Sequence, residues 1–125
     1  MPIEKVTIGS KLKLFDDYWH PRIVGQINDA HIKLVKIQGE FDWHFHEVED
    51  ELFLVISGTL LMNLREDDVE RTVTVEPGEF IIIPHGLEHR PVAPAECAIM
   101  LIEPAGTLNT GNVETGHTVR DPEWI

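Results

Sequence analysis

Three histidines and one glutamate are the residues of this chain whose types and spacing suit metal binding. His44 and His46 stand two residues apart, Glu51 follows shortly after them, and His89 comes much later. Residues two apart on a β-strand point to the same side of a sheet, so we expect His44 and His46 to face one cavity. Imidazole nitrogens with one carboxylate oxygen suit borderline transition metals. A mixed set of this kind, with room for water, is typical of a catalytic metal site rather than a structural one.

The size and charge of the chain narrow the classes of protein to consider. Its 125 residues fit one domain, and 42% hydrophobic with 26% charged residues is typical of a globular protein. The formal net charge of −12 repels phosphate backbones and anionic lipid surfaces. We therefore expect no nucleic-acid partner and no membrane partner, and a small molecule as the ligand.

The location of the protein is predicted from what the sequence lacks. No apolar run approaches the roughly 20 residues that span a bilayer, and the first residues do not resemble a signal peptide. Cys97 is the single cysteine, so the chain has no internal disulfide. It lies in an apolar stretch and is expected to be a small buried hydrophobic residue. We predict a cytoplasmic protein.

The elements that must position the four candidate ligands are predicted to be β-strands. Short apolar stretches alternate with Gly, Pro, Asn and Asp along most of the chain. About ten short strands in one small domain are typical of a β-sandwich or a closed β-barrel. The predicted strands are 11–15, 22–27, 31–38, 41–46, 52–56, 59–64, 71–75, 80–83, 89–92 and 97–103.

The pattern within these strands predicts which faces are covered. Residues 31–37 and 71–75 alternate, which predicts one face in solvent and one in the core. Residues 52–56 and 80–83 are continuously apolar, so their outer face should meet a second sheet or a second subunit. The second possibility suggests a homodimer. Residues 104–125 should form an ordered tail across the barrel, since a terminal Trp124 is expected to be buried.

The candidate ligands lie within two recognisable sequence motifs. Gly39, His44, His46, Glu51 and Gly58 resemble the first motif of the cupin superfamily, G-x5-H-x-H-x3,4-E-x6-G, over residues 39–58. The spacing matches from His44 onward, whereas Gly39 stands one residue closer to His44 than the motif has it.

A second motif lies further along the chain. Gly78, Pro84, Gly86 and His89 resemble the second cupin motif, G-x5-P-x-G-x2-H-x3-N, over residues 78–93, with Ala93 in place of the final Asn. The chain is thus similar to short single-domain bacterial cupins. The resemblance implies an all-β fold, a small cupin barrel or jelly roll of two antiparallel sheets, as a single domain over residues 1–125.

The resemblance also implies a metal site. Its ligands would be His44, His46, Glu51 and His89, holding one divalent transition metal ion per chain. Mn2+ or Fe2+ is favoured, with Ni2+ or Zn2+ as alternatives, because affinity alone does not select among these metals. Several carboxylates precede Glu51, and the register decides which of them faces inward. Glu51 has the motif spacing, and it is also the candidate catalytic residue, as a ligand that doubles as a proton shuttle.

The other histidines are weaker candidates. His85 lies near the predicted rim of the barrel and is expected to face solvent, although loops at the mouth of a site often carry function. The remaining three have no motif spacing and are interpreted as structural or surface residues. They are His20, His31 and His117.

Residues near the ligands were assigned by burial preference and strand direction. Phe41, Trp43 and Phe53 are expected in the core or lining a pocket, because small-molecule sites are mostly apolar. Arg90 follows His89 directly and should point to the opposite face of its strand. No second inward carboxylate, tyrosine or lysine was assigned as a dedicated base, since the only tyrosine, Tyr18, lies in the amino-terminal arm.

Two classes of function fit these features. The first is a metal-dependent enzyme acting on a small oxygen-rich molecule, by isomerisation, decarboxylation or dioxygen insertion. The second is a non-catalytic, metal-dependent binding module for a small molecule. Catalysis is favoured because the chain shows no DNA-binding helix or second domain to respond to a ligand. A phosphosugar substrate is disfavoured, because the ligand segments are acidic and phosphate recognition calls for Arg or Lys.

Overall fold

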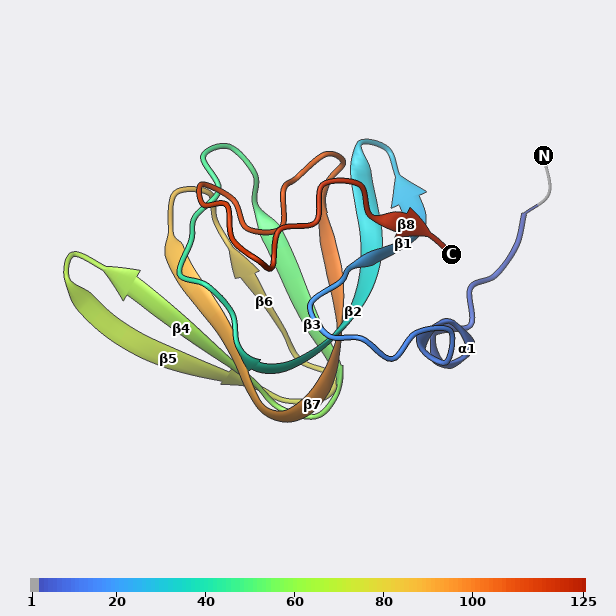
Figure 1. Ribbon diagram of the computed structural model, residues 1–125, viewed down its shortest axis with the longest axis horizontal. Helices are drawn as coiled ribbons and strands as arrows, with labels where there is room; N and C mark the ends of the chain where they lie inside the picture. The colour runs from blue at the N-terminus through green and yellow to red at the C-terminus, as the bar shows by residue number, and fades with distance from the viewer. Residues whose placement is uncertain (1–2) are drawn as a thin grey trace.

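The regular structure of this chain is almost entirely β-strand (Figure 1). It was analysed as a computed structural model that describes residues 3–125. The elements are α1 (Ile8–Leu12), β1 (Arg22–Ile27), β2 (Ala30–Glu40), β3 (Glu51–Ser57), β4 (Leu60–Glu66), β5 (Val69–Val75), β6 (Phe80–Ile83), β7 (Glu88–Pro104) and β8 (Glu123–Trp124).

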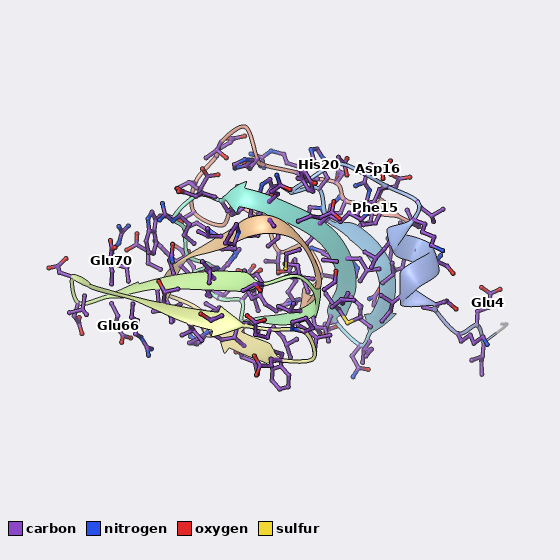
Figure 2. All side chains as sticks on the ribbon, turned by 90° about the horizontal axis from the view of Figure 1, so that it is seen from below. Glu4, Phe15, Asp16, His20, Glu66 and Glu70 are labelled. Atoms are coloured by element: carbon purple, nitrogen blue, oxygen red, sulfur yellow. The ribbon has the colours of Figure 1, made fainter. Side chains whose placement is uncertain are left out.

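The strands curve into a barrel whose interior is apolar (Figures 1 and 2). The hydrogen-bonded order is β5-β4-β7-β2-β1-β8, and β3 pairs with both β6 and β7. All pairs are antiparallel except β1 with β8. The predicted all-β barrel is confirmed, with its strands joined in one connected sheet.

The long strand β7 connects the parts of the barrel. Its first residues, 88–92, pair with β4, and its later residues pair with β2 and β3 on either side. The sequence predicted two separate strands here, 89–92 and 97–103. The structure joins them because pairing with β2 continues on both sides of an irregularity, from Gly39 with Ala93 to Ile37 with Cys97. The long strand bends back, so that His89 near its start and Glu103 near its end both lie close to Glu51 (Figure 1).

Inward side chains of β2, β3, β4 and β7 form the core, among them Val35, Val55, Met62 and Ile99. Cys97 belongs to this core and is fully buried, as predicted. Burial and the nearby charge of Glu76 raise the pKa of its thiol to about 11. This thiol is therefore protonated and unreactive at neutral pH.

The predicted strand at 11–15 is wrong. Residues Ile8–Leu12 form the short helix α1, and the chain then runs on without regular structure. Short apolar runs do not distinguish helix from strand, and this one covers the outer face of the sheet. Phe15 (labelled in Figure 2) packs there with Val24 and Leu34 in a second apolar cluster.

This covering segment also overturns the predicted solvent face of residues 31–37. Leu34 is fully buried beneath it, and Lys33 is buried on the other face. The outer side of β6, in contrast, is uncovered, with Phe80 58% and Ile82 54% exposed. The outer sheet face is thus partly covered by the amino-terminal segment and partly open.

The carboxy-terminal tail crosses the barrel opening and ends beside β1 (Figure 1). Gly111 has a positive φ, and a side chain there would collide with the carbonyl of Phe45. Only glycine allows the tail to lie this close to the segment that carries the histidines. Trp124 is 56% exposed and packs edge-on against His31, so its predicted burial is wrong. Within residues 3–125, no helix is long and apolar enough to cross a membrane.

Candidate metal centre

The four predicted ligands meet inside the barrel, at the end that the tail crosses. His44 and His46 lie between β2 and β3, Glu51 begins β3, and His89 is near the start of β7. One ligand atom from each lies within 4.8 Å of the others, and all four side chains are buried. The structure thus brings together the complete predicted set.

The local backbone differs from the prediction for residues 41–46. This segment is not a strand, and only His44 forms an isolated β-bridge, with His89. Two backbone hydrogen bonds make the bridge, from each N–H to the other residue's carbonyl, at 3.1 and 2.9 Å. The bridge sets His44 beside His89, so the two motifs are joined directly through the backbone.

Two of the imidazoles are oriented by backbone carbonyls. His44 Nδ1 lies 2.8 Å from the carbonyl oxygen of Asp42, and His89 Nδ1 lies 2.9 Å from that of Leu87. A carbonyl only accepts hydrogen bonds, so each Nδ1 carries the proton. The lone pair is therefore on Nε2, which is the arrangement of a metal-ligating histidine.

Three converging atoms have no hydrogen-bond partner among the residues that the structure describes. They are His46 Nε2, His89 Nε2 and Glu51 Oε1, and all are buried. Glu51 Oε1 lies 2.8 Å from His46 Nε2 and 3.3 Å from His89 Nε2 without the alignment of a hydrogen bond. Buried polar atoms are rarely left unpaired. A cation between them would satisfy all three, so the donor set fits a divalent metal ion.

The pKa values of the cluster favour the protonation states that metal binding needs. Burial lowers the pKa of His44 to about 4, and the neighbouring His89 adds to this effect. Burial alone would raise the pKa of Glu51, but its close contacts with Glu103, His46 and His89 outweigh it and hold this pKa well below its usual value. At neutral pH the site therefore presents a neutral His44 and an ionised Glu51.

A second buried carboxyl lies beside Glu51, and the sequence interpretation missed it. Burial, together with the charge of Glu51, raises the pKa of Glu103 well above its usual value. Lys33 Nζ lies 2.8 Å from Glu103 Oε1, and both side chains are buried. The sequence did not allow a second inward carboxylate or lysine to be assigned, and the structure identifies Glu103 and Lys33 as such residues.

Strand alternation in the sequence predicts the inward position of Lys33 and Glu103. Lys33 has the same parity as the inward residues Val35 and Ile37 on β2, and Glu103 has the same parity as the inward Leu101 on β7. Period-two alternation therefore places both charged side chains inside. Charged residues are usually exposed, and that preference concealed the pattern.

A mainly apolar cavity leads to the cluster. Phe41 and Phe53 line it, as predicted, together with His44, Glu51 and Glu103. Trp43 does not, because its ring lies outside the barrel under the guanidinium groups of Arg65 and Arg90. The other lining residues are Trp19, Pro21, Val35, Ile37, Pro91, Ile99, Leu101 and Asn109.

The tail contributes to the wall of this cavity. The ring of His117 stacks on Phe41 with a centroid distance of 5.0 Å, and Trp19 stacks on Phe41 at 4.8 Å. His117 Nδ1 lies 2.9 Å from Asp42 Oδ2, and Asn109 donates a hydrogen bond to the His117 carbonyl. His117 thus has a structural role, as predicted, and its ring packs behind the lining residue Phe41. No motif spacing marked it, because a long-range contact of the tail brings it here.

The remaining predicted positions lie away from the cluster. His85 is exposed and pairs with Asp50 at 2.9 Å, so it faces solvent as expected. Arg90 points away from the cluster and bonds Glu40 and Asn63, also as expected.

The chain belongs to the cupin domain family. The model of that family, described as Cupin domain, matches residues 32–103, more than half of the chain. This range contains all four ligands and Lys33 and Glu103.

Several known proteins are similar to the chain. A cupin-2 domain containing protein from Shewanella frigidimarina NCIMB 400 is 43% identical, with a TM-score of 0.75 over 79% of this chain and 93% of that one. The uncharacterized protein YdbB of Bacillus subtilis (strain 168) is 34% identical over 67 residues, which are 54% of this chain and 57% of that protein. The chain therefore spans little more than half of that relative.

A third similarity concerns the fold alone. Hydroquinone 1,2-dioxygenase from Sphingomonas sp. TTNP3, with 4-hydroxybenzoate bound, has a TM-score of 0.70 over 80% of this chain and 32% of that one, at 15% identity.

Proposed function

We propose that this protein is a metal-dependent enzyme that acts on a small oxygen-bearing molecule. His44, His46, Glu51 and His89 would hold one divalent metal ion. The observation that carries the proposal is the convergence of three buried, unpartnered ligand atoms, with two imidazoles already oriented to present Nε2. Such preorganisation lowers the cost of assembling a metal site.

Mn2+ or Fe2+ is the ion that we favour, with Ni2+ or Zn2+ as alternatives. Three imidazoles with one hard carboxylate suit each of these ions, so availability in the cell helps to decide among them. When bound, the ion would supply Lewis-acid polarisation of a substrate oxygen and, for Mn or Fe, redox chemistry. Four protein ligands leave coordination positions for the substrate on a six-coordinate ion.

The cavity favours a substrate with a flat or apolar body. Its described walls are aromatic and aliphatic, and none of these lining residues is Lys or Arg. Small-molecule sites of this kind select shape with apolar walls and orientation with a few polar groups. The polar groups here are His44, Glu51, Glu103 and Asn109. A phosphosugar, which needs cationic side chains, fits this cavity poorly.

Glu51 is the candidate proton carrier. It lines the cavity, so a substrate there lies within its reach, and the Glu103 carboxyl is its neighbour. A carboxylate with a protonated carboxyl beside it can accept a proton from substrate while its neighbour holds another. Such a group would suit the proton transfers of an isomerisation or a decarboxylation.

Oxidative chemistry has support from the fold. Hydroquinone 1,2-dioxygenase shares this architecture, and a hydroxylated aromatic ring suits an apolar cavity with an aromatic wall. Fold similarity alone does not determine function. The alternative is a metal-dependent binding module that uses the same cavity without turnover.

A substrate panel separates the two functions. The protein, loaded with Mn2+ or Fe2+, would be assayed with catechols, flavonols, α-keto acids, oxalate and keto sugars. We expect turnover of an aromatic or enolic member, lost in Glu51→Gln. A rise in melting temperature with one compound and turnover of none would favour the binding module, because ligand stabilisation shows binding without chemistry.

We also propose that two copies associate through the open part of the outer sheet face. Strand pairing places Ile82, Leu52 and Ile102 in one row across β6, β3 and β7. Phe80 and Ile82 are more than half exposed at its edge, and such patches commonly mark interfaces. A dimer mass for the wild type and a monomer mass for Phe80→Glu/Ile82→Glu, by light scattering, would support this. A monomeric wild type would contradict it. The cytoplasmic location remains a prediction, testable by cell fractionation.

A further inference from the structure

A buried lysine and a buried glutamate lie next to each other directly behind the ligand cluster. Lys33 and Glu103 come from the neighbouring strands β2 and β7, with side chains 2% and 1% exposed and 2.8 Å between Nζ and Oε1. Buried ion pairs contribute little stability beyond a well-packed apolar pair, because both charges lose their hydration. The surrounding inward residues, such as Val35 and Leu101, are apolar. Stability therefore does not account for a lysine and a glutamate at this place.

The second oxygen of Glu103 points to another role. Glu103 Oε2 is buried and receives no hydrogen bond from backbone or side-chain donors within residues 3–125. The carboxyl groups of Glu103 and Glu51 lie within hydrogen-bonding reach of each other, and both line the cavity. Lys33 thus fixes one oxygen of the Glu103 carboxyl, and this carboxyl lies beside the carboxylate of the ligand Glu51.

Two of the histidine ligands and the glutamate ligand each have a neighbour that can orient them. The carbonyls of Asp42 and Leu87 orient His44 and His89. Glu51 makes no such bond to a backbone group of the described residues, and Glu103 is the neighbour that contacts it. Outer partners of this kind hold first ligands in place and influence metal affinity.

We propose that Glu103, anchored by Lys33, is a positioning residue that holds the Glu51 carboxylate in its metal-binding orientation. The inference rests on the proposed metal site and adds two residues to it. Glu103 acts through Glu51, and Lys33 acts through Glu103. The pair explains why the interior keeps two charged side chains beneath an apolar cavity.

Two variants separate positioning from a structural role. Lys33→Met/Glu103→Leu replaces this buried polar pair with apolar side chains of similar size, so the fold should remain while Glu51 loses its partner. Glu103→Gln keeps the size and both contacts, since its amide can donate to Glu51 and accept from Lys33. Glu103→Gln is the conservative variant that should rescue the site.

The experiment is titration of the chelator-treated full chain with Co2+ and with Mn2+, by calorimetry and by the visible absorption spectrum of bound Co2+. We expect the double variant to bind either ion roughly 10–100-fold more weakly than the wild type, with a shifted Co2+ spectrum. Glu103→Gln should bind within about threefold of the wild type and keep its spectrum. Thermal unfolding without metal verifies that each variant folds.

The outcomes distinguish this inference from the proposed function. Wild-type affinity and spectrum in the folded double variant would overturn the positioning role and leave the metal site standing. A wild type that binds neither ion would overturn the proposed function, and the positioning role with it. If the double variant does not unfold cooperatively, Lys33→Met alone takes its place: weaker binding with a shifted spectrum supports the inference, and unchanged binding overturns it.

Discussion

The segments that carry His44 and His89 have metal-ligand side chains on the inner side of the barrel and paired polar side chains on the outer side. Trp43 and His44 are neighbours in sequence, as are His89 and Arg90, yet one member of each pair lies inside the barrel and the other outside. Inside, the histidines present buried nitrogens beside a carboxylate, and several of these atoms have no partner. Outside, the polar groups are paired.

The outer group shows how completely paired such residues can be. Arg65 makes two hydrogen bonds to Glu88, and Arg90 bonds Asn63 and Glu40. Both guanidinium groups lie over the Trp43 ring, at 4.2 and 5.1 Å from its centroid. We call Trp43, Arg65 and Arg90 with these partners the outer cluster. Paired groups stabilise the fold, whereas unpaired buried ligands indicate a bound ion, so function is expected on the inner side alone.

The largest expected effect is loss of metal from an inner variant. His46→Ala removes one of the three unpartnered ligand atoms, so its metal content after dialysis should fall at least about tenfold, as expected for a lost ligand. Arg90→Ala is the matched outer variant and should keep the wild-type content. Elemental analysis of both proteins measures this. Equal metal content in His46→Ala and the wild type would contradict the assignment of the metal site to the inner side.

The next effect is a pH dependence that arises from His44 on the inner side. The pKa of His44 is about 4 in the folded protein, against an ordinary value near 6.5. Between about pH 4 and pH 6.5, His44 is therefore protonated in the unfolded chain and neutral in the folded chain. Stability is complete above about pH 6.5 and is lost as the pH falls toward 4.

For the metal-free protein this loss amounts to about 2–3 kcal/mol at pH 4.5 from His44 alone. Urea unfolding of chelator-treated protein at pH 7.5 and pH 4.5 measures it. His44→Gln should show a smaller difference between the two pH values. The same difference in the variant and the wild type would mean that His44 titrates normally.

The smallest effect is expected from the outer cluster. Trp43→Leu removes the ring that both guanidinium groups cover, which should lower the free energy of unfolding by about 1 kcal/mol. Affinity for Mn2+ should stay within about twofold of the wild type. Chemical denaturation and calorimetry report the two quantities. A large loss of metal affinity in this variant would show that the sides are coupled.

The ligand cluster could be predicted from the sequence because its evidence is local. Spacing placed His44, His46 and Glu51 together, and a second motif supplied His89, even though the predicted strand over 41–46 does not form. The convergence depends on the bridge between His44 and His89 rather than on strand alternation.

Other parts of the site depend on contacts between distant segments. His117 stacks on Phe41 only because the tail folds back over the barrel, and no local pattern predicts this. Strand alternation predicts that the side chains of Lys33 and Glu103 point inward. The usual exposure of charged residues predicts the opposite, and burial of such a pair is rare. The fold class was clear, while α1 and the covered outer face were not, because a short apolar run fits either helix or strand.

The most direct test of the metal site is elemental analysis of untagged protein purified without chelator, beside His44→Ala/His89→Ala. From the four-residue cluster we expect about one equivalent of a divalent transition metal per chain, with Mn or Fe favoured. The double variant should hold no such metal. Wild-type protein that holds no metal, and binds none when Mn2+, Fe2+, Ni2+ or Zn2+ is supplied, would contradict the account.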